Sequence, residues 1–294
     1  MAHPIDTSRY RAHPAGRFSL TRHAPDHLPS GMNKARARTI LDAQTARLRL
    51  LQETLYAQNE WSLLLVLQGM DAAGKDSLIE HVFSGVNPQG CAVHSFKIPS
   101  DEELDHDFLW RTTLRLPRRG HIGIFNRSYY EEVIVVRVHP DLLERQRLPA
   151  PVAADPEIWR RRCEDITAYE RHLVRNGTVV RKIFLHLSPE EQRRRMIDRL
   201  SEPEKRWKFS AGDIEERSLW MHYQNAYQSA IRATSTADAP WYVVPADRKW
   251  WARAVVATII VEALSALDLA FPKVAPHETR ELERIRQALE RRDI

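Results

Sequence analysis

The sequence predicts an α/β fold, in which helices cover both faces of a parallel sheet. Short apolar runs alternate along the chain with longer segments whose apolar residues recur at helical spacing. The run 62–68 (SLLLVLQ) has no polar residue in its interior, as expected of a strand that is buried on both faces. Strands that alternate with helices in this way are typical of parallel sheets.

The individual elements follow from changes in this periodicity. Strands are expected at 62–68, 92–96, 121–125, 182–187 and 241–244. Helices are expected at 35–58, 108–116, 156–176, 189–200, 214–234 and 252–269. Residues 1–35 are rich in His, Pro, Arg and Ser, and we expect them to form an extended arm with little structure of its own. The remainder, 36–294, is predicted to be a single domain.

The composition excludes several classes of protein. The 294 residues are 43% hydrophobic and 28% charged, so the chain can bury a sizeable core and is not a disordered tail or a collagen-like rod. Cys91 and Cys163 are its only cysteines, which argues against a thiolate zinc site and favours a reduced, cytoplasmic setting. The best apolar stretch, 255–271, is interrupted by Glu262 and Asp268, so no membrane span is expected. The N-terminus lacks a hydrophobic signal segment, so export is not expected.

A loop with the spacing of a phosphate-binding motif follows the first strand. Gly69–Ser77 (GMDAAGKDS) has the form G-x-x-x-x-G-K and leads directly into a helix. In such loops the backbone curls so that its N–H groups point at phosphate oxygens, and the lysine adds a full charge. The predicted phosphate-binding residues are Gly69, Ala72, Ala73, Gly74, Lys75, Asp76 and Ser77. The alternative is a strand–helix turn that binds no ligand.

The residue after the lysine departs from this motif. A Ser or Thr at that place ordinarily ligates Mg²⁺, whereas this chain has Asp76 there and Ser77 one place late. A metal ion must therefore be held differently, and Asp71 is an available carboxylate within the loop.

A second polar cluster follows the third strand. The segment His121–Glu132 (HIGIFNRSYYEE) places it at the carboxyl end of the strand, where open α/β sheets bind their ligands. Arg127 could fork onto phosphate oxygens, and Glu131 or Glu132 could complete a metal shell with Asp71. The alternative is a surface turn with an Arg–Glu ion pair.

A third segment, 193–210, gathers many cations. Arg193–Arg195 are expected on the solvated face of a helix that breaks near Pro203. The cations that follow then lie on a short segment of the kind that closes over phosphates and excludes water. The cations singled out in this lid, at about 193–215, are Arg199, Lys205, Arg206 and Lys208.

Four segments, in this order, resemble the polyphosphate kinase 2 family. They are GMDAAGKDS, FNRSYYEEVIVVRVH, DRLSEPEKRWKFS and PWYVVPADRK, and the likeness runs from about residue 30 to about residue 270. The resemblance implies a P-loop kinase core with a small helical lid, which uses Mg²⁺ to transfer phosphoryl groups from inorganic polyphosphate to a nucleotide. It also implies a dimer or tetramer. The resemblance carries over Asp71, Lys75, Arg127, Arg199, Lys205 and Lys208.

One departure from the family pattern bears on the acceptor. Many members read FDRSWYN where this chain reads FNRSYYE, so the carboxylate has left the place of Asn126 and stands at Glu131. This pattern resembles the branch that phosphorylates AMP as well as ADP, and guanine nucleotides stay open as acceptors. We therefore expect Asp71 and Glu131 to hold Mg²⁺, while Lys75 and Arg127 bracket the transferred phosphate.

Two interpretations of Lys182 are open. It stands at the start of the fourth predicted strand, in the family-like run KIFLHL. It is either a further donor to the polyphosphate channel or a strand-end lysine in water.

Two other functions are compatible with a phosphate loop. An ATP-dependent nucleoside monophosphate kinase would share the core and the lid, but the second and third motifs are foreign to that group. A non-catalytic P-loop protein could use the modest net charge of +5 to bind polyanions without turnover. Against it, the cations gather in a lid, and no helix-turn-helix or RNA-binding signature appears, so nucleic acid is not an expected partner.

Overall fold

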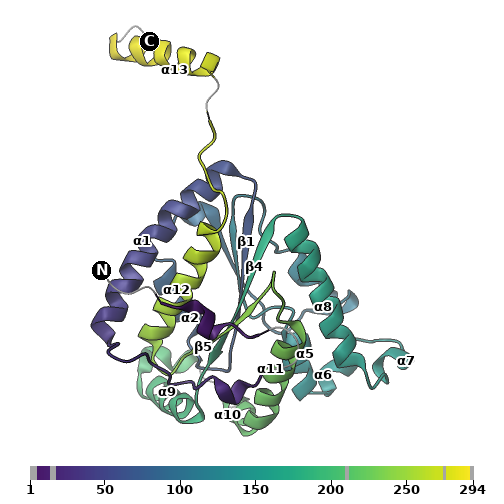
Figure 1. Ribbon diagram of the computed structural model, residues 1–294. Coiled ribbons are helices and arrows are strands. Elements are labelled where there is room, and N and C mark those ends of the chain that lie inside the picture. The colour runs from purple at the N-terminus through teal and green to yellow at the C-terminus, as the bar shows by residue number, and fades with distance from the viewer. Residues whose placement is uncertain (1–4, 14–17, 209–211, 274–275, 292–294) are drawn as a thin grey trace.

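A five-stranded, wholly parallel sheet forms the centre of the computed structural model, which describes residues 5–13, 18–208, 212–273 and 276–291 (Figure 1). The strands are β1 (Ser62–Gln68), β2 (Cys91–Ser95), β3 (Ile122–Asn126), β4 (Thr178–His186) and β5 (Trp241–Pro245). Their order across the sheet is β2-β3-β1-β4-β5. All five predicted strands are confirmed, although β4 begins at Thr178 rather than at 182.

Two sets of helices cover the two faces of this sheet (Figure 1). One face carries α1 (Lys34–Gln58), α2 (Lys75–Val82) and α12 (Lys249–Ser265). The other carries α5 (Glu131–Val138), α8 (Ile158–Arg175) and α11 (Trp220–Thr234). Alternate residues of β1 supply the two cores, with Leu63 and Leu65 on the first face and Leu64 and Val66 on the second. The predicted α/β architecture is therefore confirmed.

The remaining elements are shorter and lie mostly in the connections. They are α3 (Asp101–Asp105), α4 (Trp110–Thr113), α6 (Asp141–Glu144), α7 (Ala150–Ala153) and the 3₁₀ turns η1 (Thr7–Tyr10), η2 (Leu20–Arg22) and η3 (Pro88–Gly90). The lid region consists of α9 (Pro189–Ser201), η4 (Pro203–Lys208) and α10 (Gly212–Ser218). A last helix, α13 (Pro276–Arg291), stands apart from the rest of the molecule in Figure 1.

Several helices differ from the predicted ones. The helix expected at 108–116 is reduced to α4, and the one expected at 214–234 divides at Leu219 into α10 and α11. Helix α9 does end before Pro203, as expected. Helices α5 and α13 were not predicted. The apolar run of α5 is only eight residues long, and in so short a run periodicity does not separate a helix from a buried strand.

The N-terminal segment lies along the open edge of β5. Arg11 forms an antiparallel bridge with Tyr242, and the amide of Ala12 donates to the carbonyl of Trp241 at 2.8 Å. Ile5 and Phe18 are buried against the body. Because an edge strand exposes unpaired backbone groups, this segment shields part of the sheet from other chains.

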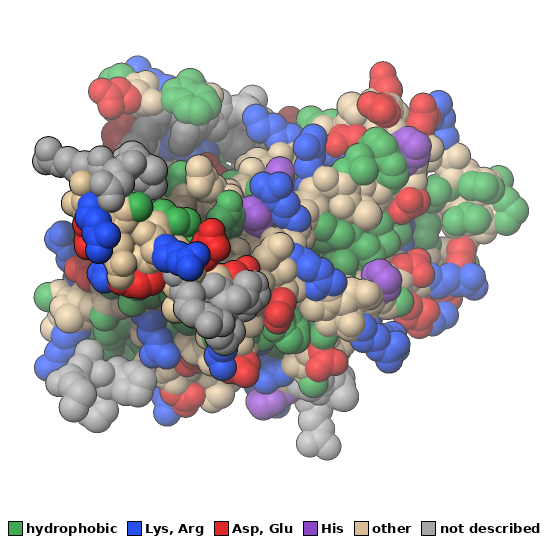
Figure 2. All heavy atoms as spheres, turned by 90° about the horizontal axis from the view of Figure 1, so that it is seen from above, with side chains coloured by type: hydrophobic (Ala, Val, Ile, Leu, Met, Phe, Trp, Pro, Cys, Tyr) green, Lys and Arg blue, Asp and Glu red, His purple; other side chains and the backbone are tan. Residues whose placement is uncertain are grey.

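Charged side chains of both signs are interspersed over the face that Figure 2 shows. This distribution agrees with the modest formal charge of +5. Within the described ranges, no helix combines the length and apolar character that crossing a bilayer requires. Both cysteines are free, and burial in α8 raises the pKa of Cys163 to about 11.

Candidate active site

The first loop has the backbone of a phosphate cradle. Between β1 and α2 the chain turns through left-handed conformations at Ala72 (φ 63°) and Gly74 (φ 100°). Gly69 is closely packed, because a Cβ there would lie 3.1 Å from both Ala73 Cβ and the carbonyl oxygen of Leu185. The loop thus contains turns of the kind found in anion-binding loops, and it leads directly into the N-terminus of α2.

Lys75 is buried in this loop. Its Nζ donates to the carbonyl oxygen of Gly69 at 2.7 Å and to that of Met70 at 3.5 Å. Burial lowers the pKa of Lys75 and the nearby Arg127 lowers it further, while Asp71 and Glu131 oppose the shift. The ammonium is thus held by loop carbonyls.

Arg127 joins the two predicted loops. Its Nη2 lies 3.0 Å from Asp71 Oδ1 in the first loop, and its Nη1 lies 3.4 Å from Glu131 Oε2 in the first turn of α5. The Glu131 charge raises the pKa of Arg127, burial opposes that rise, and Asp71 adds to it. The expected Arg–Glu ion pair exists, but the same guanidinium also bridges to the phosphate loop, so it is more than a surface turn.

A cavity of about 100 Å³ opens beside this bridge. It is lined by Gly69, Met70, Asp71, Arg127, Glu131, Val135, Gln192, Glu216, Tyr223 and Tyr227. The lining contains three carboxylates and one guanidinium, at the carboxyl ends of β1 and β3, where ligands of parallel sheets bind. Of this set, Gly69, Asp71, Arg127 and Glu131 were predicted from the sequence as site residues.

The residues that the lid and α11 contribute to the cavity were not predicted from the sequence. Glu216 of α10 lies 3.0 Å from His139 Nε2 and accepts a hydrogen bond from the hydroxyl of Tyr223. Burial raises the pKa of Tyr223, and Glu216 adds to the rise. No motif marks these positions. The one available signal is the spacing of Glu216, Tyr223 and Tyr227 by seven and four residues, which would place them on one side of a continuous helix.

Helix α9 supports the phosphate loop from the lid side. Arg195 Nη1 donates to the carbonyl oxygens of Ala72 and Ala73, each at 3.0 Å. Gln192 Nε2 donates to the carbonyl oxygen of Asp71 at 3.0 Å. The expectation that Arg195 is solvated, like the exposed Arg193 and Arg194, is wrong. The loop carbonyls need donors, and only the tertiary fold brings α9 to them.

The other predicted phosphate-binding residues do not line the cavity. Asp76 Oδ1 accepts a hydrogen bond from Asn126 Nδ2 at 2.7 Å, and Ser77 Oγ accepts one from Arg253 at 3.2 Å. Arg199 is half-buried in α9. Lys205 and Lys208 belong to η4, and their side chains lie outside what the structure describes. The role of these lid cations stays a prediction.

Neither interpretation of Lys182 is correct. Because β4 begins at Thr178, Lys182 lies within the strand and is completely buried. Its Nζ pairs with Glu170 of α8 and donates to Tyr130 Oη at 3.0 Å. Both the polyphosphate channel and water are therefore excluded as its surroundings.

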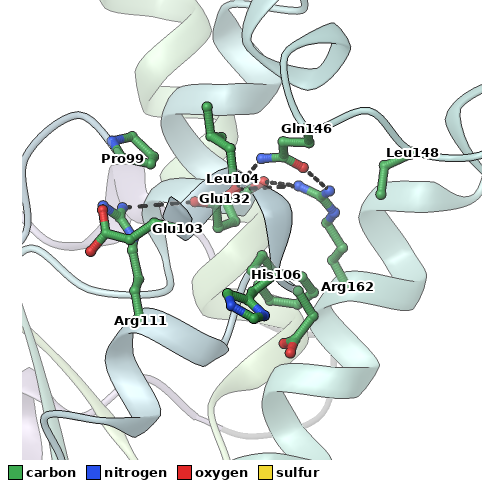
Figure 3. A pocket seen from close by; sticks show the side chains of 11 residues that line it. Pro99, Glu103, Leu104, His106, Arg111, Glu132, Gln146, Leu148 and Arg162 are labelled. Carbon is green, nitrogen blue, oxygen red and sulfur yellow. Dashed lines mark hydrogen bonds and ion pairs between the residues drawn. The ribbon is translucent and has the colours of Figure 1, made fainter. Parts of the chain in front are cut away.

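Glu132 points away from the first cavity into a second one, which Figure 3 shows. Its carboxylate lies 3.8 Å from Arg111 and 3.5 Å from Arg162, and it accepts a hydrogen bond from Gln146 at 2.6 Å. Burial raises the pKa of Glu132, and the two arginines oppose the rise. Of the two glutamates considered as metal ligands, only Glu131 faces Asp71.

The carboxylates of Asp71 and Glu131 fit a magnesium ion. Mg²⁺ prefers hard oxygen ligands and in phosphotransfer sites commonly takes one or two carboxylates together with substrate phosphates. Within the described ranges, no group of three or more His, Cys, Asp or Glu side chains is arranged to hold a metal by itself. A pair of carboxylates facing a cavity that could admit phosphate matches this mode.

The contact between Asn126 and Asp76 yields a prediction. Asn126→Asp would set two carboxylates against each other, and sharing a proton would raise the pKa of one of them. A raised carboxyl pKa in the folded state costs stability as pH rises. In EDTA we expect the variant to lose about 1–3 kcal/mol relative to wild type at pH 8 and less at pH 5, by denaturant unfolding. The reciprocal double variant Asn126→Asp/Asp76→Asn should recover most of the loss, and a loss independent of pH would contradict the account.

Comparison with known proteins identifies the family of this chain. The model of the family Polyphosphate kinase 2 matches residues 31–272. The chain is similar to an ADP-polyphosphate phosphotransferase of Rhodopseudomonas palustris, with 48% identity over 97% of this chain and 99% of the relative. It is also similar to an AMP/ADP-polyphosphate phosphotransferase of Meiothermus ruber, with 46% identity over 90% and 95% of the two chains. Among solved structures, a polyphosphate kinase 2 from Arthrobacter aurescens TC1 superposes with a TM-score of 0.84 at 40% identity, covering 93% of this chain and 94% of the other. This chain therefore belongs to the polyphosphate kinase 2 family.

Proposed function

We propose that this protein is an enzyme that transfers a phosphoryl group from inorganic polyphosphate to a nucleoside mono- or diphosphate, converting AMP to ADP and ADP to ATP. The observation that carries the proposal is the Arg127 guanidinium, set between Asp71 and Glu131 beside the phosphate loop. The names of the two relatives, one acting on ADP and the other on AMP and ADP, support the same chemistry.

Phosphoryl transfer demands position and charge from the protein more than covalent chemistry. In our proposal, Lys75 leaves the carbonyl of Gly69 for a phosphate oxygen, while Arg127 approaches the same phosphate from the second loop. Each cation would stabilise charge that spreads over the phosphate oxygens in the transition state. The acceptor phosphate is ionised near neutral pH, so the reaction requires no strong general base.

Asp71 and Glu131 are the residues that we propose to hold Mg²⁺. When bound, the ion would neutralise charge on the phosphate oxygens. The carboxylates themselves have a second effect, since they keep the Arg127 fork oriented towards the cavity through contacts of 3.0 and 3.4 Å. Release of these contacts to the metal would free the guanidinium for the substrate.

Removal of one of these charges provides a test of the metal role. Asp71→Asn is expected to lower turnover by about two orders of magnitude, as loss of one electrostatic contact at a reacting phosphate commonly does. The loss should not be restored by excess Mg²⁺, which a magnesium titration of initial rates would measure. The exposed Asp42→Asn on α1 is the matched control. Full activity of Asp71→Asn would remove this residue from the proposed metal site.

We propose that the cations of the lid bind along the polyphosphate chain that donates the phosphoryl group. Arg199, Lys205 and Lys208 belong to α9 and η4, and α9 contacts the phosphate loop through Arg195. A polyphosphate chain has a high charge density, so its binding should weaken steeply with salt, by the counterion argument developed for nucleic acids.

A matrix of donors and acceptors tests the whole proposal. Polyphosphate or ATP is combined with AMP, ADP, GMP or GDP, and the products are separated by chromatography. ADP should appear from AMP and polyphosphate without any ATP. A strict need for ATP would favour the nucleoside monophosphate kinase, and polyphosphate that is bound but never shortened would favour the non-catalytic protein.

We also propose a cytoplasmic homo-oligomer, a dimer or tetramer, as its working form. The two free cysteines support a reducing compartment. Light scattering after size-exclusion chromatography would measure the assembly, and the guanine arms of the same matrix would decide the breadth of the acceptor site.

A further inference from the structure

The second loop holds Arg127 in an unusual backbone conformation. Its φ is 65°, in the left-handed region that residues with a side chain rarely adopt. Such a conformation persists only where the surroundings over-determine it. The amide of Arg127 donates to the carbonyl oxygen of Leu67 in β1 at 3.0 Å, which fixes the loop where it leaves β3. The position of the loop after Arg127 depends on the contacts that hold residues 128–132.

Two tyrosines, Tyr129 and Tyr130, anchor residues 128–132 in the protein core. The hydroxyls of Tyr129 and Tyr130 both donate to Glu170 Oε1, at 3.0 and 2.8 Å. Lys182 pairs with the other oxygen of Glu170 and also donates to the carbonyl of Thr234 at 2.8 Å. Both tyrosine side chains are completely buried. Neither can move without leaving a buried charged group short of a hydrogen bond.

A second contact holds the same segment one residue beyond Glu131. Arg162 Nη1 donates to the backbone carbonyl of Glu132 at 3.2 Å and lies 3.5 Å from its carboxylate. Gln146 links the two side chains, as Figure 3 shows. Arg162 and Glu170 are both buried residues of α8, and their separation of eight residues puts them on one face of that helix.

We infer that α8 holds residues 127–132 in place from the protein interior, with Glu170 and Arg162 as positioning residues that fix Arg127 and Glu131. Tyr129, Tyr130 and Glu132 are directed into the protein, so Glu131 is the residue of this turn that faces the cavity. Neither Glu170 nor Arg162 lines that cavity. The inference rests on the proposed function, since it assigns these residues to the placement of the groups that would contact phosphate.

The test removes the tyrosine hydroxyls while leaving the ion pair of Glu170 and Lys182 in place. The double variant Tyr129→Phe/Tyr130→Phe should lower kcat by roughly ten- to a hundredfold, because misplacement of a catalytic group by about 1 Å has effects of this size. KM for polyphosphate and for the nucleotide should stay within about twofold. Arg162→Lys, which keeps the charge but loses the planar guanidinium with its paired donors, should also lower kcat.

Ile166→Ala is the matched control. Ile166 lies between Arg162 and Glu170, is completely buried, and belongs to the apolar cluster beneath the sheet. Its truncation should lower Tm by several degrees through lost packing, yet leave kcat at 25 °C near that of wild type. If the tyrosine variant loses stability but keeps the wild-type kcat, the inference is overturned.

Two further readouts separate this inference from the proposed function. In an Arg127→Ala background the tyrosine substitutions should lower kcat/KM less than they do in wild type, because only Glu131 remains to be misplaced, whereas a full additive effect would show that they act elsewhere. A crystal structure of the tyrosine variant should show Arg127 displaced from Asp71, and an unmoved Arg127 would overturn the inference without reference to activity. A wild-type protein that never consumes polyphosphate would instead refute the proposed function.

Discussion

Replacement of Lys75 by alanine is expected to lower turnover with polyphosphate and AMP by about two orders of magnitude or more. The ammonium is buried at the loop and held by the carbonyl of Gly69 at 2.7 Å, so its loss removes a fixed positive charge from the proposed phosphate site. Burial lowers the pKa of Lys75, and an anion bound beside it would favour the charged form again. Initial rates from chromatography of ADP would measure the loss.

The control for this variant is the exposed Lys34→Ala at the start of α1, which should behave as wild type. Thermal unfolding of Lys75→Ala should be recorded alongside, because removal of a buried lysine from loop carbonyls also changes stability. Near-normal turnover in a folded Lys75→Ala protein would mean that the transferred phosphate lies elsewhere.

Arg127→Ala is expected to have an effect of similar or larger size, about two to three orders of magnitude in kcat. The substitution removes a cation from the proposed phosphate site and leaves Asp71 and Glu131 facing one cavity without the guanidinium that pairs with both. Arg127→Lys should recover only part of the activity, because an ammonium cannot bridge two carboxylates with a planar fork.

Arg171→Ala, an exposed arginine of α8, is the matched control for charge. Excess Mg²⁺ should improve Arg127→Ala slightly, since a cation can occupy the space between the carboxylates, but it should not restore wild-type turnover. Full recovery by the metal alone would reduce Arg127 to a counter-ion and contradict its role at the phosphate.

Local sequence patterns predicted the parts of the site that depend on backbone geometry. The glycines of the first loop are demanded by close contacts and by left-handed φ angles, as at Gly69 and Gly74, and these needs are visible in the motif itself. Arg127 was found because the carboxyl ends of neighbouring parallel strands meet at one edge of the sheet. Both inferences rest on rules that act over a few residues or on the sheet as a whole.

Residues whose role depends on burial were predicted poorly. Lys182 stands at the start of an apolar run and Arg195 in a run of arginines, and both are buried against partners more than ten residues away in the sequence. Glu216 and Tyr223 reach the cavity only because α10 and α11 fold back over the carboxyl end of the sheet. No local pattern encodes such distant pairings.

The amino-acid sequence by itself determined the alternation of strands and helices, the phosphate loop and the arginine opposite it, because each follows from short-range sterics, periodicity and strand direction. The tertiary structure alone decided which charges face the cavity. Burying a charge is costly unless a partner meets it. The charged partners of Glu132 and Lys182 come from distant segments, and Arg195 adds distant loop carbonyls to its ion pair with Glu191 of the same helix. Because those side chains pair within the protein, Asp71, Arg127 and Glu131 remain together at the cavity.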